Sequence, residues 1–264
     1  MIRWIVRTAL PPLLVFVVVV GLWEWAVAWR AAHSGGVYEM PLPRPSGIFA
    51  ALRDDTGDLA RATWTTAQGA LIGFAASAVV GVIAAIGLAS ASWVRRAFYP
   101  YTVFFQTVPV IAIAPMLEIW AGPGLVAVSI VAFIVSVFPV ISATLTGLLS
   151  TDPALVDLFQ LYGAPRSARL LKLRLPWALP NLLTGLRVAA GLSVIGTVVA
   201  EFFVGTYGDD EGLGVRVVTD AKYAHVDGVF ACVLLASLLG LALFGFVNLA
   251  GRLLLRRWHA SERE

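Results

Sequence analysis

The sequence predicts an all-α membrane protein with about six transmembrane helices. Apolar residues make up 59% of the 264 residues and charged residues only 13%, and the mean hydropathy is +0.85. Ordinary soluble domains carry about 25% charged residues. The apolar residues gather in long runs, and about 20 of them suffice to cross a bilayer. The chain therefore has room for about six spans, and we expect one transmembrane domain over residues 1–264.

The first apolar run, from about Thr8 to Trp29, follows two arginines. It is longer than the apolar core of a signal peptide, which has about 7–15 residues, so we expect it to be a retained first span. The proline-rich segment Pro41–Ser46 predicts an extended stretch. Ser46 is the expected N-cap of a short helix through Leu52.

The second span is expected from Trp64 to Ala89, and a small residue occupies every fourth position of it. A ridge of small residues lets another helix approach closely. We expect this ridge to pack against a helix of the same subunit or of a dimer partner. Its members are Gly69, Gly73, Ser77, Gly81, Ala85 and Ala89.

The third span, from Phe98 to about Trp120, contains prolines at positions 100, 109 and 115. Proline has no N–H and clashes with the preceding turn, so we expect a kinked span with unpaired carbonyl groups near Gln106 and Thr107. Broken helices in membranes often line a cavity. A plain kink packed by its neighbours is the alternative.

A tight turn at Gly122-Pro123-Gly124 precedes the fourth span, which extends to about Leu149. The fifth span is expected from Trp177 to about Val204, and the sixth from Val229 to about Leu254. Arginine and lysine are in excess at both termini, after the second span and between the fourth and fifth spans. Because such an excess marks the cytoplasmic side, we expect both termini in the cytoplasm.

The connection between the fourth and fifth spans, residues 150–176, is the long charged and amphipathic segment of the chain. Thr151 or Asp152 can cap a helix that has Pro153 in its first turn and ends at Gly163-Ala164-Pro165. A second, basic helix is expected to end at Pro176. The apolar stripe of the first helix consists of Leu155, Leu158, Phe159 and Tyr162. Such a pair of helices suits a groove of another protein, and an amphipathic loop on the membrane surface is the alternative.

This stretch resembles the coupling loop of ABC importer permeases, whose motif is Glu-Ala-Ala, three residues, Gly, nine residues and Ile-x-Leu-Pro. Asp157-Leu158-Phe159 stands for the triplet, Gly163 follows after three residues, and Leu173-Arg174-Leu175-Pro176 follows after nine more. The spacing is kept, whereas Leu and Phe are much larger than Ala. The resemblance implies that an ABC ATPase contacts Asp157, Leu158, Phe159, Gly163, Ala164, Pro165, Arg166, Leu175 and Pro176.

Residues 42–46, 105–115 and 182–202 resemble the nitrate, sulfonate and taurine branch of these permeases, which also includes carriers of pyrimidine, thiamine-precursor or flavin-type solutes. The resemblance implies an inner-membrane homodimer with two separate ATPase subunits, which hold ATP and Mg²⁺. It further implies an extracytoplasmic solute-binding protein that delivers a small polar or anionic solute. Glu118 stands where the family usually has an apolar residue.

The sequence carries no recognisable catalytic motif. A phosphate-binding loop needs Gly-Lys followed by Ser or Thr, but Lys172 and Lys222 follow Leu and Ala. The three histidines are far apart and have no cysteine or carboxylate at metal-ligand spacing. We therefore expect no enzyme activity, cofactor or metal in this chain. Its basic residues lie beside apolar runs, at lipid boundaries, and do not indicate nucleic-acid binding.

Two charged residues of the fifth span, Arg187 and Glu201, are candidates for the translocation path. They are fourteen residues apart, about 21 Å along a helix, so they cannot pair directly. A charged side chain that faces lipid at the centre of the bilayer costs at least about 2.5 kcal/mol. Alternatively, Arg187 reaches the cytoplasmic headgroups and Glu201 the outer water. The expected path residues are Gln106, Thr107, Arg187, Ser193, Thr197 and Glu201.

The competing functional class is an ion-coupled secondary transporter or channel, in which intramembrane charges couple ions directly. Glu24, Arg187 and Glu201 keep this class open. The sequence shows no internal repeat of the kind that many such transporters have, and the coupling-loop spacing favours the importer. A membrane scaffold without transport activity is a third interpretation.

Overall fold

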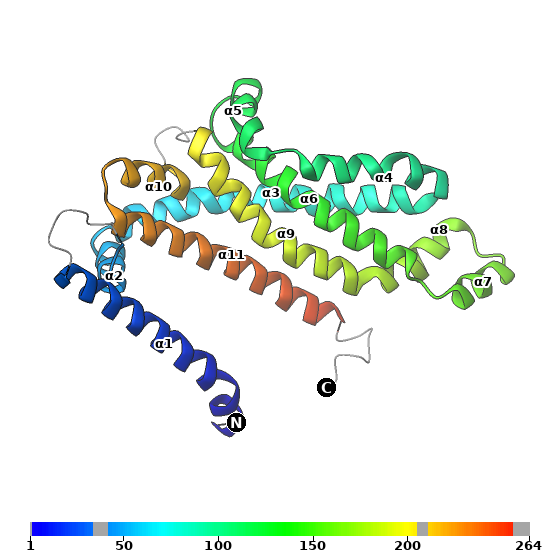
Figure 1. Ribbon diagram of the computed structural model, residues 1–264. Helices are drawn as coiled ribbons and strands as arrows, with labels where there is room; N and C mark the ends of the chain where they lie inside the picture. Colours follow the sequence, from blue (N-terminus) through cyan, green and yellow to red (C-terminus); the bar gives the residue numbers. More distant parts are fainter. Residues whose placement is uncertain (1, 34–41, 205–210, 256–264) are drawn as a thin grey trace. The chain divides into compact units, whose positions relative to one another are not determined.

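The computed structural model describes residues 2–33, 42–204 and 211–255, and over these it contains helices and no strand (Figure 1). Five helices are long and apolar enough to cross a membrane, and a bent pair counts as a sixth span if taken together. The expected all-α class with about six spans is therefore confirmed. The elements are α1 (Ile2–His33), α2 (Pro45–Asp54), α3 (Thr56–Ser90), α4 (Ser92–Thr107), α5 (Val110–Ala121), α6 (Leu125–Leu149), α7 (Pro153–Leu161), α8 (Arg166–Arg169), the π-helical turn η1 (Leu170–Arg174), α9 (Leu175–Val204), α10 (Leu213–Lys222) and α11 (Val226–Leu255).

The chain forms two compact units. Unit 1 consists of Met1–Ala60 and Arg216–Leu234, and unit 2 of Arg61–Val215 and Leu235–Glu264. In unit 1, Trp23 of α1 lies beside Phe230, with ring centroids 6.1 Å apart. Unit 2 holds most of the apolar helices, and its core is built around α6.

The predicted N-cap of α2 is wrong. The helix begins at Pro45, and Arg44 occupies the cap position without a side-chain cap bond. Proline suits the first helical position because its missing N–H would have no partner there. Ser46 instead binds Glu24 of α1: its hydroxyl donates to one carboxylate oxygen at 3.0 Å and its N–H to the other at 3.1 Å.

The small-residue ridge of α3 packs against α6 within the same chain. A Cβ added at Gly73 would overlap the Cβ of Ala132 and lie 2.9 Å from the carbonyl oxygen of Ser129. From the other side, a Cβ at Gly185 of α9 would lie 2.8 Å from the carbonyl oxygen of Pro139. These glycines let the backbones of α3 and α9 reach the backbone of α6. The prediction that the ridge packs on another helix is confirmed.

The third span is broken, where the sequence predicted a kink. α4 and α5 are separate helices bent by 94° at the break between them. Val108 at the break has φ −66° and ψ 126°, the extended conformation that a following proline favours. Pro100 and Pro115 lie inside α4 and α5 and end neither helix. One proline of the three, Pro109, therefore sets the geometry.

The predicted helix end at Pro176 is also wrong. α8, η1 and α9 follow one another without a break over Arg166–Val204, a segment of 39 residues. In η1 the N–H of Leu175 donates to the carbonyl of Leu170, five residues back. Because Pro176 has no N–H, an α-helix would lose a bond at that residue. The wider π turn directly before it changes the bonding pattern where the proline enters the helix.

A buried carboxylate connects three segments of unit 2. Glu201 of α9 is 1% exposed, and its two oxygens lie 3.0 Å from the donating hydroxyl of Thr66 on α3. The N–H of Gly214 donates to Glu201 at 2.8 Å, and the N–H of Leu213 donates to the Thr66 hydroxyl at 2.8 Å. The first N–H groups of a helix have no partner within it. Thr66 and Glu201 therefore fix the start of α10.

We expect Gly73→Ala to lower the melting temperature of the detergent-solubilised protein. The added methyl group would crowd the α6 backbone, and overpacking typically costs about 1–3 kcal/mol. Gly87→Ala on the same helix is the matched control, because nothing lies within 4 Å of its Cβ position. Alanine is about 1 kcal/mol better than glycine in a helix, so the control should melt no lower than the parent. Equal melting temperatures for the two variants would contradict the packing of α3 on α6.

We expect Thr66→Val to accelerate amide hydrogen exchange at Leu213 and Gly214. The substitution removes one donor to Glu201 and the acceptor of the Leu213 N–H, and a buried unsatisfied polar group costs about 1–3 kcal/mol. Thr184→Val is the control, since the Thr184 hydroxyl is exposed and donates to Pro180 in its own helix. Exchange at the start of α10 that is the same in both variants would show that the network does not hold this helix.

Candidate functional site

The connection between α6 and α9 presents a short helix, α7, whose apolar face is uncovered. Its N-terminus is capped by Asp152, whose carboxylate accepts from the N–H of Ala154 at 2.8 Å. None of the residues of α7 is buried, and Leu161 is 85% exposed and Tyr162 83%. A short helix with an exposed apolar face is what docking into the groove of a partner requires.

The C-terminal end of α7 is fixed by a glycine turn. Gly163 has φ +67°, a conformation that glycine adopts without steric cost. The N–H of Gly163 donates to Gln160 and that of Ala164 to Phe159, both at 2.9 Å. These bonds satisfy carbonyl groups at the end of the helix. The sequence prediction of a helix end at Gly163-Ala164-Pro165 agrees with this geometry.

The base of the connection is closed by a tryptophan. The indole N–H of Trp177 donates to the carbonyl oxygen of Ser150 at 3.0 Å, which joins the end of α6 to the start of α9. Of the two expected caps, Asp152 performs the role, whereas Thr151 is buried and donates to Leu148. α7 is therefore capped at its N-terminus and ended by the glycine turn, and its most exposed apolar side chains lie at its C-terminal end.

The predicted coupling residues lie along one stretch of this connection. Asp157, Leu158, Gly163, Pro165 and Arg166 are exposed, and Phe159, Ala164, Leu175 and Pro176 are half-buried. The large residues of the motif thus differ in position: Leu158 is 44% exposed, whereas Phe159 is turned partly into its own chain. The most accessible apolar side chains, Leu161 and Tyr162, follow the triplet.

The predicted path residues are divided by the structure into two groups. Gln106 and Thr107 are exposed at the end of α4, beside the break. Arg187 is half-buried, and its Nε finds no hydrogen-bond partner among the described residues. This N–H is itself covered by the surrounding chain.

The second group is enclosed within unit 2. Ser193 and Thr197 are 0% exposed, and their hydroxyls donate at 2.9 Å to carbonyls of Ala190 and Ser193 in their own helix. Glu201 belongs to the network with Thr66. Sequence reasoning missed Thr66, whose only signal is a hydroxyl at one end of an apolar span. The place of these buried residues in a path stays a prediction.

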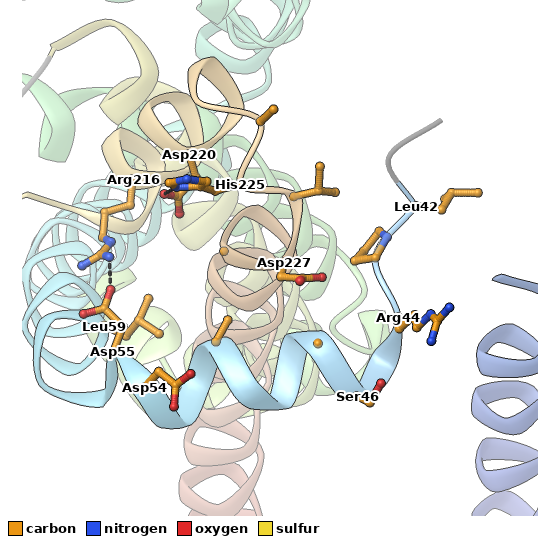
Figure 2. A pocket seen from close by; sticks show the side chains of 16 residues that line it. Leu42, Arg44, Ser46, Asp54, Asp55, Leu59, Arg216, Asp220, His225 and Asp227 are labelled. Atoms are coloured by element: carbon orange, nitrogen blue, oxygen red, sulfur yellow. Dashed lines mark hydrogen bonds and ion pairs between the residues drawn. The ribbon is translucent and has the colours of Figure 1, made fainter. Parts of the chain in front are cut away.

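Unit 1 contains an acidic recess with a volume of about 780 Å³ (Figure 2). α2 contributes Asp54 and Asp55 to it, and the α10–α11 region contributes Asp220 and Asp227. Arg216 forms an ion pair with Asp55. Within the described part of the chain, no three histidine, cysteine or acidic side chains are placed to hold a metal ion. The recess joins α2 to residues that follow the fifth span, far away in the sequence.

Comparisons with known proteins agree with this architecture. Residues 77–257 match the family described as binding-protein-dependent transport system inner membrane component. A formylaminopyrimidine transport permease protein of Halalkalibacterium halodurans is 33% identical over 252 residues, which cover 94% of this chain and 95% of that protein. A riboflavin transport system permease protein of Chloroflexus aurantiacus is 31% identical over 238 residues, which cover 89% of this chain and 87% of that protein.

A solved structure supports the fold. The crystal structure of an amino acid ABC transporter with histidines matches with a TM-score of 0.60 at 13% identity, covering 77% of this chain and 97% of that one. Permeases named for aliphatic sulfonates, taurine and nitrate also match, as the sequence resemblance predicted. The chain therefore belongs to the binding-protein-dependent transport system inner membrane components and is the permease subunit of an ABC importer.

Proposed function

We propose that two copies of this chain form the translocation path for a small polar or anionic solute, and that a separate ATPase drives transport by docking on α7. The relatives are named for nitrogen heterocycles such as formylaminopyrimidine and riboflavin and for sulfonates, taurine and nitrate. The solute of this permease belongs to one of these classes. Family membership favours this function over an ion-coupled secondary transporter.

The observation that carries the ATPase assignment is the uncovered α7 between two fixed ends. Its apolar side chains Leu161 and Tyr162 are more than four-fifths exposed, at 85% and 83%. Energy coupling needs a rigid element that both sites can bias. The unbroken segment Arg166–Val204 supplies such an element between the docking region and the membrane. ATP and Mg²⁺ are held by the ATPase, and this chain has no catalytic role.

The distribution of basic residues sets the proposed orientation. Both termini, the α3–α4 connection and α7 lie in the cytoplasm, as the positive-inside rule requires. Residues 150–176 then form a cytoplasmic coupling loop inside a single permease domain, residues 1–264. The segments that form the acidic recess precede the second and sixth spans, so the recess lies on the outer side. A solute-binding protein delivers the solute from that side.

Arg187 is the residue of this chain that best fits a polar or anionic solute. It is a half-buried cation in a membrane span, and guanidinium groups bind carboxylate or phosphate oxygens through paired N–H donors. Gln106 and Thr107, exposed at the α4–α5 break, extend the polar lining. The sequence also predicts that Ser193, Thr197 and Glu201 belong to this path, and we keep them in the proposal.

We expect Gly163→Val to abolish most solute uptake by the reconstituted importer while membrane insertion is kept. Valine is strained at φ +67°, so the end of α7 would move and docking of the ATPase would weaken. Gly163→Asn is the matched control, because asparagine tolerates the left-handed region. Uptake and ATPase co-purification are measured together. Normal uptake by a stable Gly163→Val protein would contradict the docking role.

We expect Arg187→Gln to reduce uptake by about tenfold or more, since hydrogen bonds to charged groups contribute about 1.5–3 kcal/mol. ATPase assembly and basal ATP hydrolysis should be retained, because Arg187 lies in the membrane span and not in α7. Arg187→Lys keeps the charge and should retain more activity. If both variants transport like the parent, Arg187 merely reaches the lipid headgroups, and its path role is wrong.

A further inference from the structure

A second cavity, about 360 Å³ in volume, lies in unit 2 between the end of α3 and the segment α8–η1. Three arginines, Arg166, Arg169 and Arg174, contribute guanidinium groups to its lining. Ser90 and Ser167 also line the cavity, and Ile86 of α3 forms part of an apolar wall. The Ser90 hydroxyl donates to the carbonyl of Gly87 at 2.6 Å. None of these residues belongs to the predicted path, and only Arg166 belongs to the predicted ATPase contact.

The charge of this cavity is not compensated within the described chain. Among the described residues, no ion pair with a carboxylate is found for Arg166, Arg169 or Arg174, whereas Arg216 pairs with Asp55 in unit 1. The Nε of Arg169 is buried and has no hydrogen-bond partner among these residues. Like charges gathered around one cavity repel each other, and a bound anion would relieve this repulsion.

The π turn brings two of the arginines to one side. In an α-helix, residues five apart point about 140° away from each other around the axis. Arg169 and Arg174 are five apart, but η1 between them closes a bond from the Leu175 N–H to the Leu170 carbonyl. With bonds that span five residues, positions five apart lie closer together around the axis than in an α-helix. The turn that admits Pro176 therefore also gathers the guanidinium groups.

We propose that this cavity binds the phosphate group of an anionic phospholipid. Guanidinium groups match phosphate oxygens with paired donors, and basic pockets between transmembrane helices bind anionic headgroups on the cytoplasmic side. The surroundings are those of a membrane boundary: Leu171 is 63% exposed and Trp93 69%, and tryptophan is enriched at lipid–water interfaces. Naming the leaflet as cytoplasmic depends on the orientation proposed above.

The lipid is favoured over an acidic side chain of the ATPase by the walls of the cavity. One wall is the last turn of α3, a helix apolar enough to span the membrane, and Ile86 in it suits an acyl chain. The apolar face that suits a protein groove lies on α7, at Leu161 and Tyr162. An ATPase carboxylate in the cavity is the outcome that the experiment must separate.

The test uses the purified full-length chain without its ATPase. Native mass spectrometry measures retention of phosphatidylglycerol, titrated against a background of phosphatidylcholine, for the parent, Arg169→Gln/Arg174→Gln and Arg95→Gln/Arg96→Gln. The last variant loses the same charge from the α3–α4 connection and the start of α4, outside the cavity lining. An arginine near an anionic membrane contributes about fivefold in affinity by general attraction alone. Because the cavity arginines also bind the phosphate directly, the cavity variant should lose more than about 25-fold, and clearly more than the control.

Three results would overturn the proposal. Equal losses in the two variants would show only general surface attraction. Inorganic phosphate that raises the melting temperature of the chain by itself, with no effect of phosphatidylglycerol, would assign the cavity to a free anion. In a separate experiment with the ATPase present, Arg169→Gln/Arg174→Gln could lose ATPase co-purification while its lipid retention is unchanged. This result would assign the cavity to an ATPase carboxylate. Because retention is measured on the chain alone, these results do not depend on whether the proposed solute is transported.

Discussion

The close approach of α3 and α9 to α6 is the constraint on which unit 2 depends. Helices in lipid gain little by exchanging acyl chains for apolar side chains, so their association depends on close packing and on polar contacts. Glycines provide the close packing: added Cβ atoms at Gly81 of α3 and Gly185 of α9 would both lie 2.8 Å from α6 atoms. The polar contacts come from Glu201, which joins α9 to Thr66 of α3 and to the start of α10. The same backbone distances set where α7 leaves the bundle.

Local patterns of the sequence were sufficient for much of this fold. The proline after Asp152 and the glycine at position 163 act on neighbours a few residues away, and their structures agree with the predictions. The small residues at four-residue steps on α3 predicted a packing face, and the structure shows that this face packs on α6. The prolines were harder to interpret. Pro100 and Pro115 are accommodated inside helices, and Pro109 ends one, although all three have the same local chemistry. The residues around each proline therefore do not indicate which of the three breaks the span.

The candidate site was predictable to a similar degree. The spacing from Asp157 to Pro176 predicted a coupling loop at residues 150–176, and in the structure Leu161 and Tyr162 are the most exposed apolar side chains of this segment. The charged residues of the fifth span were visible, but their surroundings were not. Thr66 lies 135 residues from Glu201, and no short motif indicates such a pair. The acidic recess likewise joins α2 to the α10–α11 region across the sequence (Figure 2).

The π turn Leu170–Arg174 also has a mechanical consequence. It joins α8 to α9 without a break (Figure 1), so a displacement of α8 is not absorbed by a flexible loop. A π turn holds one residue more than the α-helical turn it replaces, and each residue of an α-helix advances the azimuth by about 100°. Exchange between the two bonding patterns would thus rotate α8 about the axis of α9. The connection through η1 therefore resists bending but allows a rotation of defined size. A simple hinge would lack this defined rotation.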